Sequence, residues 1–399
     1  MKSFNLRTRV AKGAALVAFL AVGATVVTSG LPAANADPQF ANAFVGVGSD
    51  TTQDVMNAQA GFVNGSFYPP AVSSEATGFK GIVSWDALVP GAPDNCITPK
   101  LKAPTIYRSN GSSEGRRSLS RAIDGGAYGP VAQCGGSKAT AGLIDYARSS
   151  SGPSSGDTGT ALTYIPFGRD GIGFAYYGNG VANPVTSLTR AQLTSLFTTG
   201  PQTINGVQIV PCGIQLGSGT YSFWNSVTTA TAGQEAAATA TCNAAGGGTR
   251  LQENSPADLK AKGDALVGQQ VIVGFSGAVY IAQANGVASK EAVAGVNLGA
   301  ISNNGSGTDL GVPTTGTAPN MAPNSTYFAD SVFGRNVYNV LDTARVEGFG
   351  NNDLKSLFVG PTSAICSAQA QTVVNTFGFS STPSCGSTTL TGSLLSGIQ

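Results

Sequence analysis

Three short segments rich in glycine and hydroxyl side chains each come directly before a run of residues that predicts a helix. They are residues 48–52 (Gly-Ser-Asp-Thr-Thr), 110–115 (Asn-Gly-Ser-Ser-Glu-Gly) and 216–220 (Leu-Gly-Ser-Gly-Thr). The start of a helix exposes unpaired backbone N–H groups and the positive end of the helix dipole. Hydroxyl groups beside such helix starts form an anion site without any formal positive charge. The pattern is therefore typical of loops that bind one oxyanion, and by itself it does not indicate a catalyst.

Apolar, strand-like runs alternate with these loops, which predicts an α/β fold. Residues 43–47 form such a run before the first loop, and the helix after it is expected to begin at Asp50 or Thr51 and to reach about Val63. Two longer runs, 164–176 and 271–280, predict extended crossings between two lobes. Shorter strands are predicted at 105–108 and 143–147, and helices at 116–123, 338–341, 354–358 and 371–377.

The chain contains no histidine, which excludes several kinds of catalytic site. Residues 111–115 match the G-x-S-x-G pattern of hydrolase nucleophiles, but that chemistry needs an imidazole to accept the serine proton. The sequence also lacks the Walker phosphate loop, the dinucleotide G-x-G-x-x-G and C-x-x-C, and its cysteines are too dispersed for a zinc site. We therefore expect no enzyme activity, no cofactor and no metal. An enzyme that uses a pair of carboxylates remains open.

The first residues predict an exported protein. Four cations precede an apolar run, residues 14–27, which leads to the small-x-small sequence Ala34-Asn35-Ala36. This order is typical of a signal peptide, residues 1–36, that is cleaved after Ala36. The residue directly after the cleavage point is not a cysteine, so we expect no lipid anchor and a secreted, extracellular or cell-envelope location. An uncleaved membrane anchor is the alternative.

The charge of the mature chain argues against nucleic-acid binding. Removal of residues 1–36 leaves 18 Lys and Arg against 21 Asp and Glu, a formal net charge of −3. Binding to nucleic acid or to an anionic membrane needs a basic face. Charged residues make up 11% of the full chain, which contains 54 glycines, so the surface must consist largely of uncharged polar groups.

Six cysteines, an even number, lie in the mature part of this exported chain, and disulfides are the expected state. Fifteen pairings are possible for six cysteines. We favour pairing between sequence neighbours because each pair then falls within one proposed lobe segment. The predicted disulfides are Cys96 with Cys134, Cys212 with Cys242, and Cys366 with Cys385.

In the order of these motifs, the chain resembles the solute-binding proteins of the phosphate-binding type, which have the second type of periplasmic-binding-protein fold and serve ATP-driven (ABC) importers. The resemblance covers nearly all of the mature chain. It rests on residues 46–52, 111–115, 145–150 and 217–224, and on the helix-like stretch 188–197 before the last of them. The stretch 188–197 and the Ser-Gly-Thr sequence at 218–220 are the most specific matches.

The resemblance implies a site of four loops around a small oxyanion, first of all phosphate. We name them loop A (48–52), loop B (110–115), loop C (148–153) and loop D (216–220). Asp50 is the candidate acceptor for an O–H group on the ligand, and the other residues are hydrogen-bond donors. The expected ligand-binding residues are Ser49, Asp50, Thr51, Thr52, Ser112, Ser113, Ser149, Ser150, Ser218, Gly219 and Thr220.

Two departures from the family pattern concern the charged residues of its phosphate site. The family has an arginine a few residues before the Ser-Gly-Thr sequence, where this chain supplies only Gln215, and the family's ligand-binding aspartate falls on Ser150. Charge-assisted hydrogen bonds contribute more than neutral ones, so the missing arginine weakens the expected anion affinity. Arg148 or Arg108 could enter the cleft instead.

The expected architecture is two-lobed, with residues 38–162 and 272–399 in one lobe, residues 163–271 in the other, and the ligand in the cleft between them. The expected partners are the small oxyanion and the membrane permease of an ABC importer. The main alternative is a binding-protein fold reused as a secreted envelope or adhesive protein that binds no phosphate tightly.

Overall fold

The computed structural model describes residues 43–63, 66–68, 70–72, 81–88 and 95–397. The proposed signal peptide, with its cleavage site, lies outside these residues. Within the described ranges, no helix is both long enough and apolar enough to cross a bilayer.

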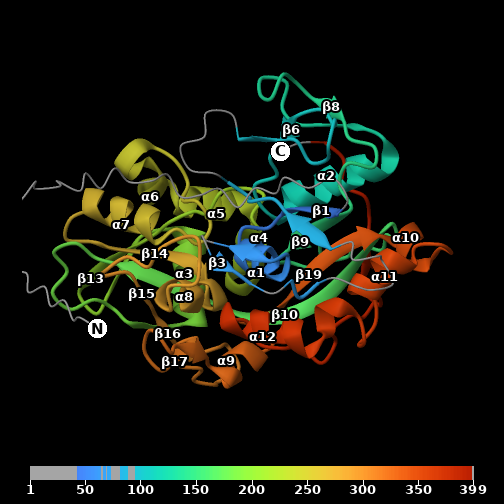
Figure 1. Ribbon diagram of the computed structural model, residues 1–399. Coiled ribbons are helices and arrows are strands. Elements are labelled where there is room, and N and C mark those ends of the chain that lie inside the picture. The colour runs from blue at the N-terminus through green and yellow to red at the C-terminus, as the bar shows by residue number, and fades with distance from the viewer. Residues whose placement is uncertain (1–42, 64–65, 69, 73–80, 89–94, 398–399) are drawn as a thin grey trace, which may run out of the picture. The chain divides into compact units, whose positions relative to one another are not determined.

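A mixed sheet of ten strands, as far as the chain is described, forms the centre of the fold (Figure 1). Its strand order is β12-β13-β14-β10-β19-β9-β1-β4, and β15 and β20 also pair with β10. Strands β4, β1 and β9 are parallel to one another, as are β13 and β14, whereas β10 and β19 are antiparallel to their neighbours. The strands are β1 (Phe44–Gly48), β4 (Ile82–Ser84), β9 (Tyr146–Ser149), β10 (Leu162–Tyr177), β12 (Gln202–Ile204), β13 (Val207–Pro211), β14 (Gln270–Ser276), β15 (Asn297–Leu298), β19 (Gly334–Asp342) and β20 (Thr391–Gly392).

The longest strand, β10, joins the two halves of this sheet. From Leu162 to Gly171 it pairs with β19, and from Ile172 to Tyr177 it pairs with β14. Nearly all of its side chains are buried, as expected for a strand with both faces covered. A large apolar cluster spans both halves and includes Phe167 and Ile272. Two smaller clusters each pack on one half, one around Val47 and Leu119 and another around Val210 and Val273.

Helices follow most strands. They are α1 (Gln53–Gln59), α2 (Ser112–Asp124), α3 (Arg190–Thr199), α4 (Gly219–Thr228), α5 (Ala232–Ala238), α6 (Ala240–Ala244), α7 (Pro256–Ala265), α8 (Gly277–Ala284), α9 (Ser325–Ala329), α10 (Thr343–Glu347), α11 (Asn352–Phe358) and α12 (Ala368–Thr376), with the 3-10 turns η2 (Ala245–Gly247) and η3 (Ala364–Cys366). Short two-stranded pairs complete the described chain: β2 (Phe62–Val63) with β3 (Ser66–Phe67), β5 (Cys96–Ile97) with β6 (Ile106–Tyr107), β7 (Ala127–Tyr128) with β8 (Lys138–Ala139), β11 (Ser187–Thr189) with β16 (Ala300–Asn303), and β17 (Thr314–Thr315) with β18 (Ala322–Pro323).

The predicted α/β class and the predicted disulfides are confirmed. Cys96 is bonded to Cys134, Cys212 to Cys242 and Cys366 to Cys385. Each bond closes a short loop, which limits the freedom of the unfolded chain. The boundaries of the two lobes, at residues 38–162, 163–271 and 272–399, remain a prediction.

Several local predictions were wrong. Residues 338–341, expected to be helical, lie in strand β19, which pairs with β10 on one side and β9 on the other. Buried and half-buried residues largely alternate along β19, as expected for a strand. The run 271–280 is a strand only as far as Ser276. This residue is also the N-cap of α8, which begins at Gly277. Helix α1 has Thr52 as its N-cap and ends at Gln59, and α2 begins four residues earlier than expected.

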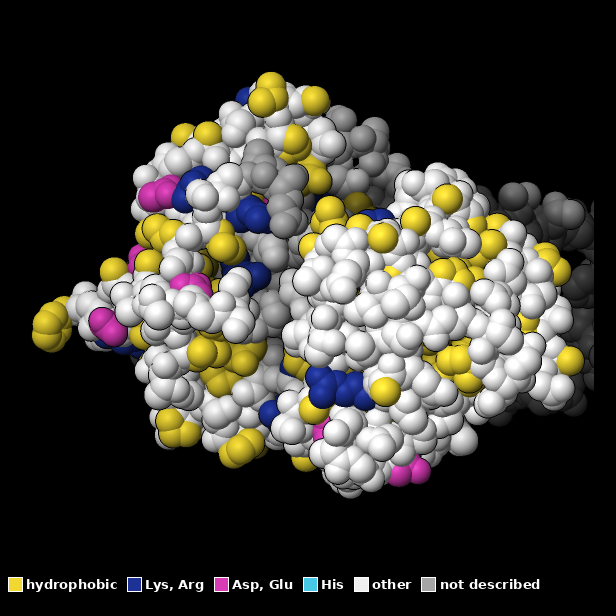
Figure 2. Space-filling view, turned by 180° about the vertical axis from the view of Figure 1, so that it is seen from behind, with side chains coloured by type: hydrophobic (Ala, Val, Ile, Leu, Met, Phe, Trp, Pro, Cys, Tyr) yellow, Lys and Arg dark blue, Asp and Glu magenta, His cyan; other side chains and the backbone are white. Residues whose placement is uncertain are grey.

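The face drawn in Figure 2 carries few charged side chains, and its apolar side chains occur in small groups. This face is consistent with the low charged fraction of the sequence.

Candidate functional site

Loop A is fixed by a buried arginine beneath it. Arg148, fully buried in β9, donates hydrogen bonds to the carbonyl oxygens of Gly48 (3.3 Å), Ser49 (3.2 Å) and Trp85 (2.7 Å). Burial lowers the pKa of this guanidinium. Arg148 therefore holds the backbone of loop A, and its described contacts are with the protein itself rather than with a cleft.

Loops B and C meet through serine hydroxyls. Ser112, the first residue of α2, accepts a hydrogen bond from the backbone N–H of Ser150 at 3.0 Å, and the two hydroxyl oxygens are 3.3 Å apart. The hydroxyl of Ser149 instead donates to the carbonyl of Ser151, within its own turn. Ser112 and Ser150 thus form one wall of the site.

Loop D packs against this wall at a glycine. A Cβ atom at position 219 would collide with the hydroxyl oxygens of both Ser112 and Ser150. The backbone N–H of Ser113 also donates to the carbonyl of Gly217 at 2.9 Å. Only glycine allows this approach, so loops B, C and D are in direct contact.

Loop D reaches loop A through Thr220. Its hydroxyl oxygen lies 3.3 Å from that of Thr51, and both side chains are buried. Ser218, the residue before Gly219, accepts from the N–H of Tyr221 and so caps helix α4. We call the four loops, together with the buried side chains that bond to them, the cradle. The eleven predicted residues belong to these loops, and their role in ligand binding remains a prediction. Seven of their nine hydroxyls already have a hydrogen-bond partner among the described residues: those of Thr51, Ser112, Ser113, Ser149, Ser150, Ser218 and Thr220.

Some polar groups of the cradle are buried without a hydrogen-bond partner among the described residues. They include the hydroxyls of Ser49 and Thr52 and one guanidinium nitrogen, Nη1, of Arg335. A buried donor without a partner costs about 1–3 kcal/mol. A ligand that accepts hydrogen bonds from these groups would recover that cost.

Arg335 is a cradle residue that the sequence did not predict. It comes from strand β19, is 5% exposed, and donates from Nη2 to the hydroxyl oxygen of Thr220 at 2.8 Å. Its Nε and Nη2 also bind Oδ2 of the fully buried Asp170 on β10, at 3.2 and 3.0 Å. Burial raises the pKa of Asp170, and the neighbouring Arg335 opposes that rise. The cradle therefore contains an arginine, although not at the position expected from the family pattern.

Glu253 is the second residue that the sequence did not predict. Its side chain is fully buried, and Oε1 accepts hydrogen bonds from the hydroxyl of Thr51 (2.8 Å) and the backbone N–H of Thr220 (3.2 Å). Its other oxygen, Oε2, has no partner among the described residues. Burial raises the pKa of Glu253, and the nearby carboxylate of Asp50 raises it further.

No sequence motif marks Arg335 or Glu253. Each is a single charged residue in an ordinary strand or loop. Glu253 bonds to Thr51, 202 residues away in the chain, and Arg335 bonds to Thr220, 115 residues away. Arg335 also lies close in sequence to residues 338–341, which we expected to be helical, so the sequence did not predict the strand that carries it.

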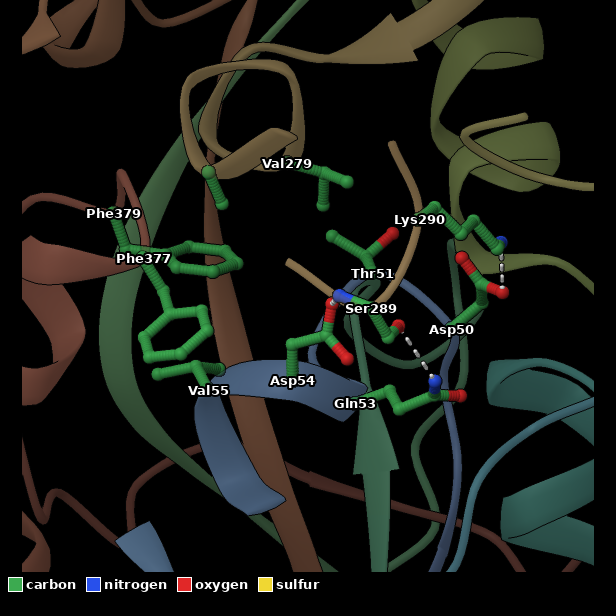
Figure 3. A pocket seen from close by; sticks show the side chains of 11 residues that line it. Asp50, Thr51, Gln53, Asp54, Val55, Val279, Ser289, Lys290, Phe377 and Phe379 are labelled. Atoms are coloured by element: carbon green, nitrogen blue, oxygen red, sulfur yellow. Dashed lines mark hydrogen bonds and ion pairs between the residues drawn. The ribbon is translucent and has the colours of Figure 1, made fainter. Parts of the chain in front are cut away.

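Asp50 does not stand alone as an acceptor, because Lys290 pairs with it at 2.6 Å. Figure 3 shows this pair at one side of a pocket next to the cradle. The opposite side of the pocket is apolar and contains Phe377 and Phe379. Asp54 lies between the two sides, and its pKa is raised by burial.

Metal binding has no evident site in the described part of the chain, where no three carboxylate or cysteine residues cluster in a way that could hold an ion. The cradle instead offers hydroxyls, backbone N–H groups and a guanidinium. This set of groups fits an oxyanion that accepts hydrogen bonds.

No protein-family model matches the chain, and a comparison with curated proteins found no match either. Solved structures do resemble it. A phosphate ABC transporter substrate-binding protein with bound phosphate, from Clostridium perfringens, is 15% identical, with a TM-score of 0.47; the match covers 86% of this chain and 100% of that one. An ABC-type phosphate transport receptor from Vibrio cholerae is also 15% identical, with a TM-score of 0.47, and the match covers 84% and 99% of the two chains.

A phosphate-binding protein from Stenotrophomonas maltophilia is 11% identical, with a TM-score of 0.42 and coverage of 86% of this chain and 92% of that one. These proteins are of the kind that the sequence motifs resemble. Identities and TM-scores this low decide nothing about the ligand of this chain, whose function has to be inferred from its own residues.

Proposed function

We propose that this chain is a secreted solute-binding protein that captures a small oxyanion, phosphate first of all, in the cradle. The observation that carries the proposal is the meeting of four hydroxyl-rich loops, distant in sequence, one of which is bonded at Thr220 to the guanidinium of Arg335. Two of these loops lead into α2 and α4, helices of 13 and 10 residues, whose first turns expose backbone N–H groups.

Useful affinity requires several groups of the cradle to bind the ligand together. Micromolar binding requires about 8 kcal/mol of net free energy. Neutral hydrogen bonds contribute about 1 kcal/mol each, and a bond to a charged group contributes about 1.5–3 kcal/mol. Arg335 supplies a charged donor in place of the arginine of the family pattern, which this chain lacks before loop D.

The cradle is closed, since loop D touches loops A, B and C directly. A ligand can therefore enter only if loop D moves away from the other three. We propose that bending along β10, where its pairing passes from β19 to β14, allows this movement, and that the closed form presents the surface recognised by the permease of an ABC importer. The proposed binding step breaks no covalent bond.

A second candidate function is favoured by Glu253. Its carboxylate already accepts hydrogen bonds from Thr51 and Thr220, and an internal anion at this position opposes an external one. A fold reused as an envelope or adhesive protein, without tight phosphate binding, would have this property.

Binding of phosphate to matched threonine variants tests the proposal. We expect Thr220→Val to weaken phosphate binding by about 1–3 kcal/mol, because it removes a cradle hydroxyl while preserving the side-chain shape. Thr228→Val is the control: Thr228 is on the same helix and buried, and its hydroxyl bonds only to the carbonyl of Trp224 among the described residues. Isothermal titration calorimetry of the mature protein gives both affinities.

If Thr220→Val and the original protein bind phosphate equally, phosphate binds elsewhere. If neither binds phosphate, sulfate or arsenate, the envelope or adhesive function replaces the proposed one.

A further inference from the structure

Glu253 occupies hydrogen-bond donors that an oxyanion would use. The hydroxyl of Thr51 and the backbone N–H of Thr220 both donate to its Oε1, at 2.8 and 3.2 Å. The N–H of Thr220 belongs to the first turn of α4, where the helix dipole favours a negative charge. A carboxylate oxygen accepts hydrogen bonds as a phosphate oxygen does. Glu253 therefore satisfies two donors of the cradle in the way that a bound oxyanion would.

The segment around Glu253 is held in this position by contacts on both sides. The backbone N–H of Glu253 donates to the side chain of Gln215, and its carbonyl accepts from Lys290 at 2.9 Å. Gln252 and Asn110 exchange two amide hydrogen bonds, at 3.0 and 3.1 Å. These contacts join the segment to Gln215, to Lys290 and to loop B, so the carboxylate is inserted by a fixed backbone rather than by a free side chain.

The charges around the cradle make a second anion costly while Glu253 is ionised. Asp50 is paired with Lys290, Asp170 is paired with Arg335, and the buried guanidinium of Arg148 holds loop A. Glu253 has no ion-pair partner among the described residues, and its Oε2 has no hydrogen-bond partner there. An added phosphate would bring a second negative charge close to this carboxylate in a buried site, where charges are poorly screened.

We propose that Glu253 is a built-in anion that competes with the external oxyanion for the cradle and so sets the affinity for it. This inference rests on the proposed function. Phosphate displaces the carboxylate or binds once the carboxylate is protonated, and the pH of the surroundings then determines how readily the cradle is filled.

Calorimetry with inorganic phosphate, on the original protein and on Glu253→Gln, tests the competition. Glutamine keeps the shape of the side chain and an oxygen that can accept from Thr51 and Thr220, but it removes the charge. Because a close like charge shifts a site by about one to three pKa units, we expect Glu253→Gln to bind phosphate about tenfold more tightly or better at pH 8. The advantage should narrow as the pH falls and Glu253 of the original protein takes up its proton.

At each pH the two proteins meet the same mixture of phosphate ionisation states. The effect of phosphate titration therefore cancels in the ratio of their two affinities. Glu291→Gln is the control, because it makes the same chemical change at an exposed glutamate beside Lys290. Glu253→Ala serves as a second variant in case the glutamine side chain disturbs the packing. Buffers of different ionisation heat separate the two routes at pH 8. Protonation of Glu253 on binding gives about one more proton taken up per phosphate than in Glu253→Gln, whereas displacement of the ionised carboxylate gives no difference.

The outcomes separate the two proposals. Tighter binding by Glu253→Gln, with or without measurable binding by the original protein, supports the competition. Equal affinity of the original protein and both variants at every pH, with no difference in proton uptake, overturns it and leaves the proposed function standing. Failure of all forms to bind phosphate, sulfate or arsenate overturns the proposed function, and the competition with it.

Discussion

Arg335 and Glu253 define the chemistry of the cradle at the scale of single residues. The guanidinium offers a donor, Nη1, that has no partner in the described part of the chain, and the carboxylate occupies neighbouring donors. Both are buried, and burial increases the strength of their interactions. In the cradle, Arg335 therefore attracts an external anion and the nearby Glu253 competes with it.

The raised pKa of Glu253 predicts how stability depends on pH. A carboxyl whose pKa is higher in the folded state than in the unfolded state binds its proton more tightly when folded. Its contribution to stability is fully present below the unfolded pKa, near the ordinary value of 4.5, and is lost as the pH rises through the folded pKa. We expect the ligand-free protein to gain stability relative to Glu253→Gln as the pH falls through this window.

Urea unfolding of both proteins between pH 5 and 8 measures this difference. Asp54 and Asp170, whose pKa values are also raised by burial, are present in both proteins and cancel in the comparison. Parallel pH profiles would show that Glu253 titrates no differently in the folded and unfolded chains.

The close approach of loop D to loops B and C is the decisive contact at the scale of elements. It depends on Gly219, where a methyl group would meet two serine hydroxyls. We expect Gly219→Ala to destabilise the protein by about 1–3 kcal/mol, the usual effect of overpacking, and to weaken phosphate binding.

Gly233→Ala is the matched control for this change. A Cβ at Gly233, in helix α5, would meet no atom within 4 Å, and alanine is the better helix former. Denaturant unfolding should show the loss in Gly219→Ala and no loss in Gly233→Ala. Equal stability of the two variants would mean that loop D can move away from loops B and C at no cost.

The elements of the cradle were predictable because their signals are local. Glycine and hydroxyl residues before a helix mark loops A, B and D in the sequence, and nearest-neighbour pairing gave all three disulfides. Residues 338–341 of strand β19 were wrongly predicted to be helical, because the alternation of buried and half-buried residues along this strand is short. Arg335 and Glu253 were missed because their roles arise only when distant elements come together. Arg148 was considered for the cleft, but it binds backbone carbonyls instead.

Strand β10 relates the cradle to the whole molecule. It carries Asp170, the partner of Arg335, close to the point where its own pairing passes from β19 to β14. Movement of the β14 side relative to the β19 side would change the distance between Thr220 on α4 and Arg335 on β19. Binding in the cradle and bending along β10 are therefore expected to be coupled.

The most direct test of oxyanion capture is a crystal structure of the mature protein grown with arsenate, a heavier analogue of phosphate whose arsenic atom is located by anomalous scattering. We predict one strong arsenic peak in the cradle, within hydrogen-bonding reach of Thr220 and Arg335, with the carboxylate of Glu253 displaced from Thr220 or protonated beside the ligand. A cradle in which Glu253 keeps both of its hydrogen bonds and no arsenic peak appears would contradict the account.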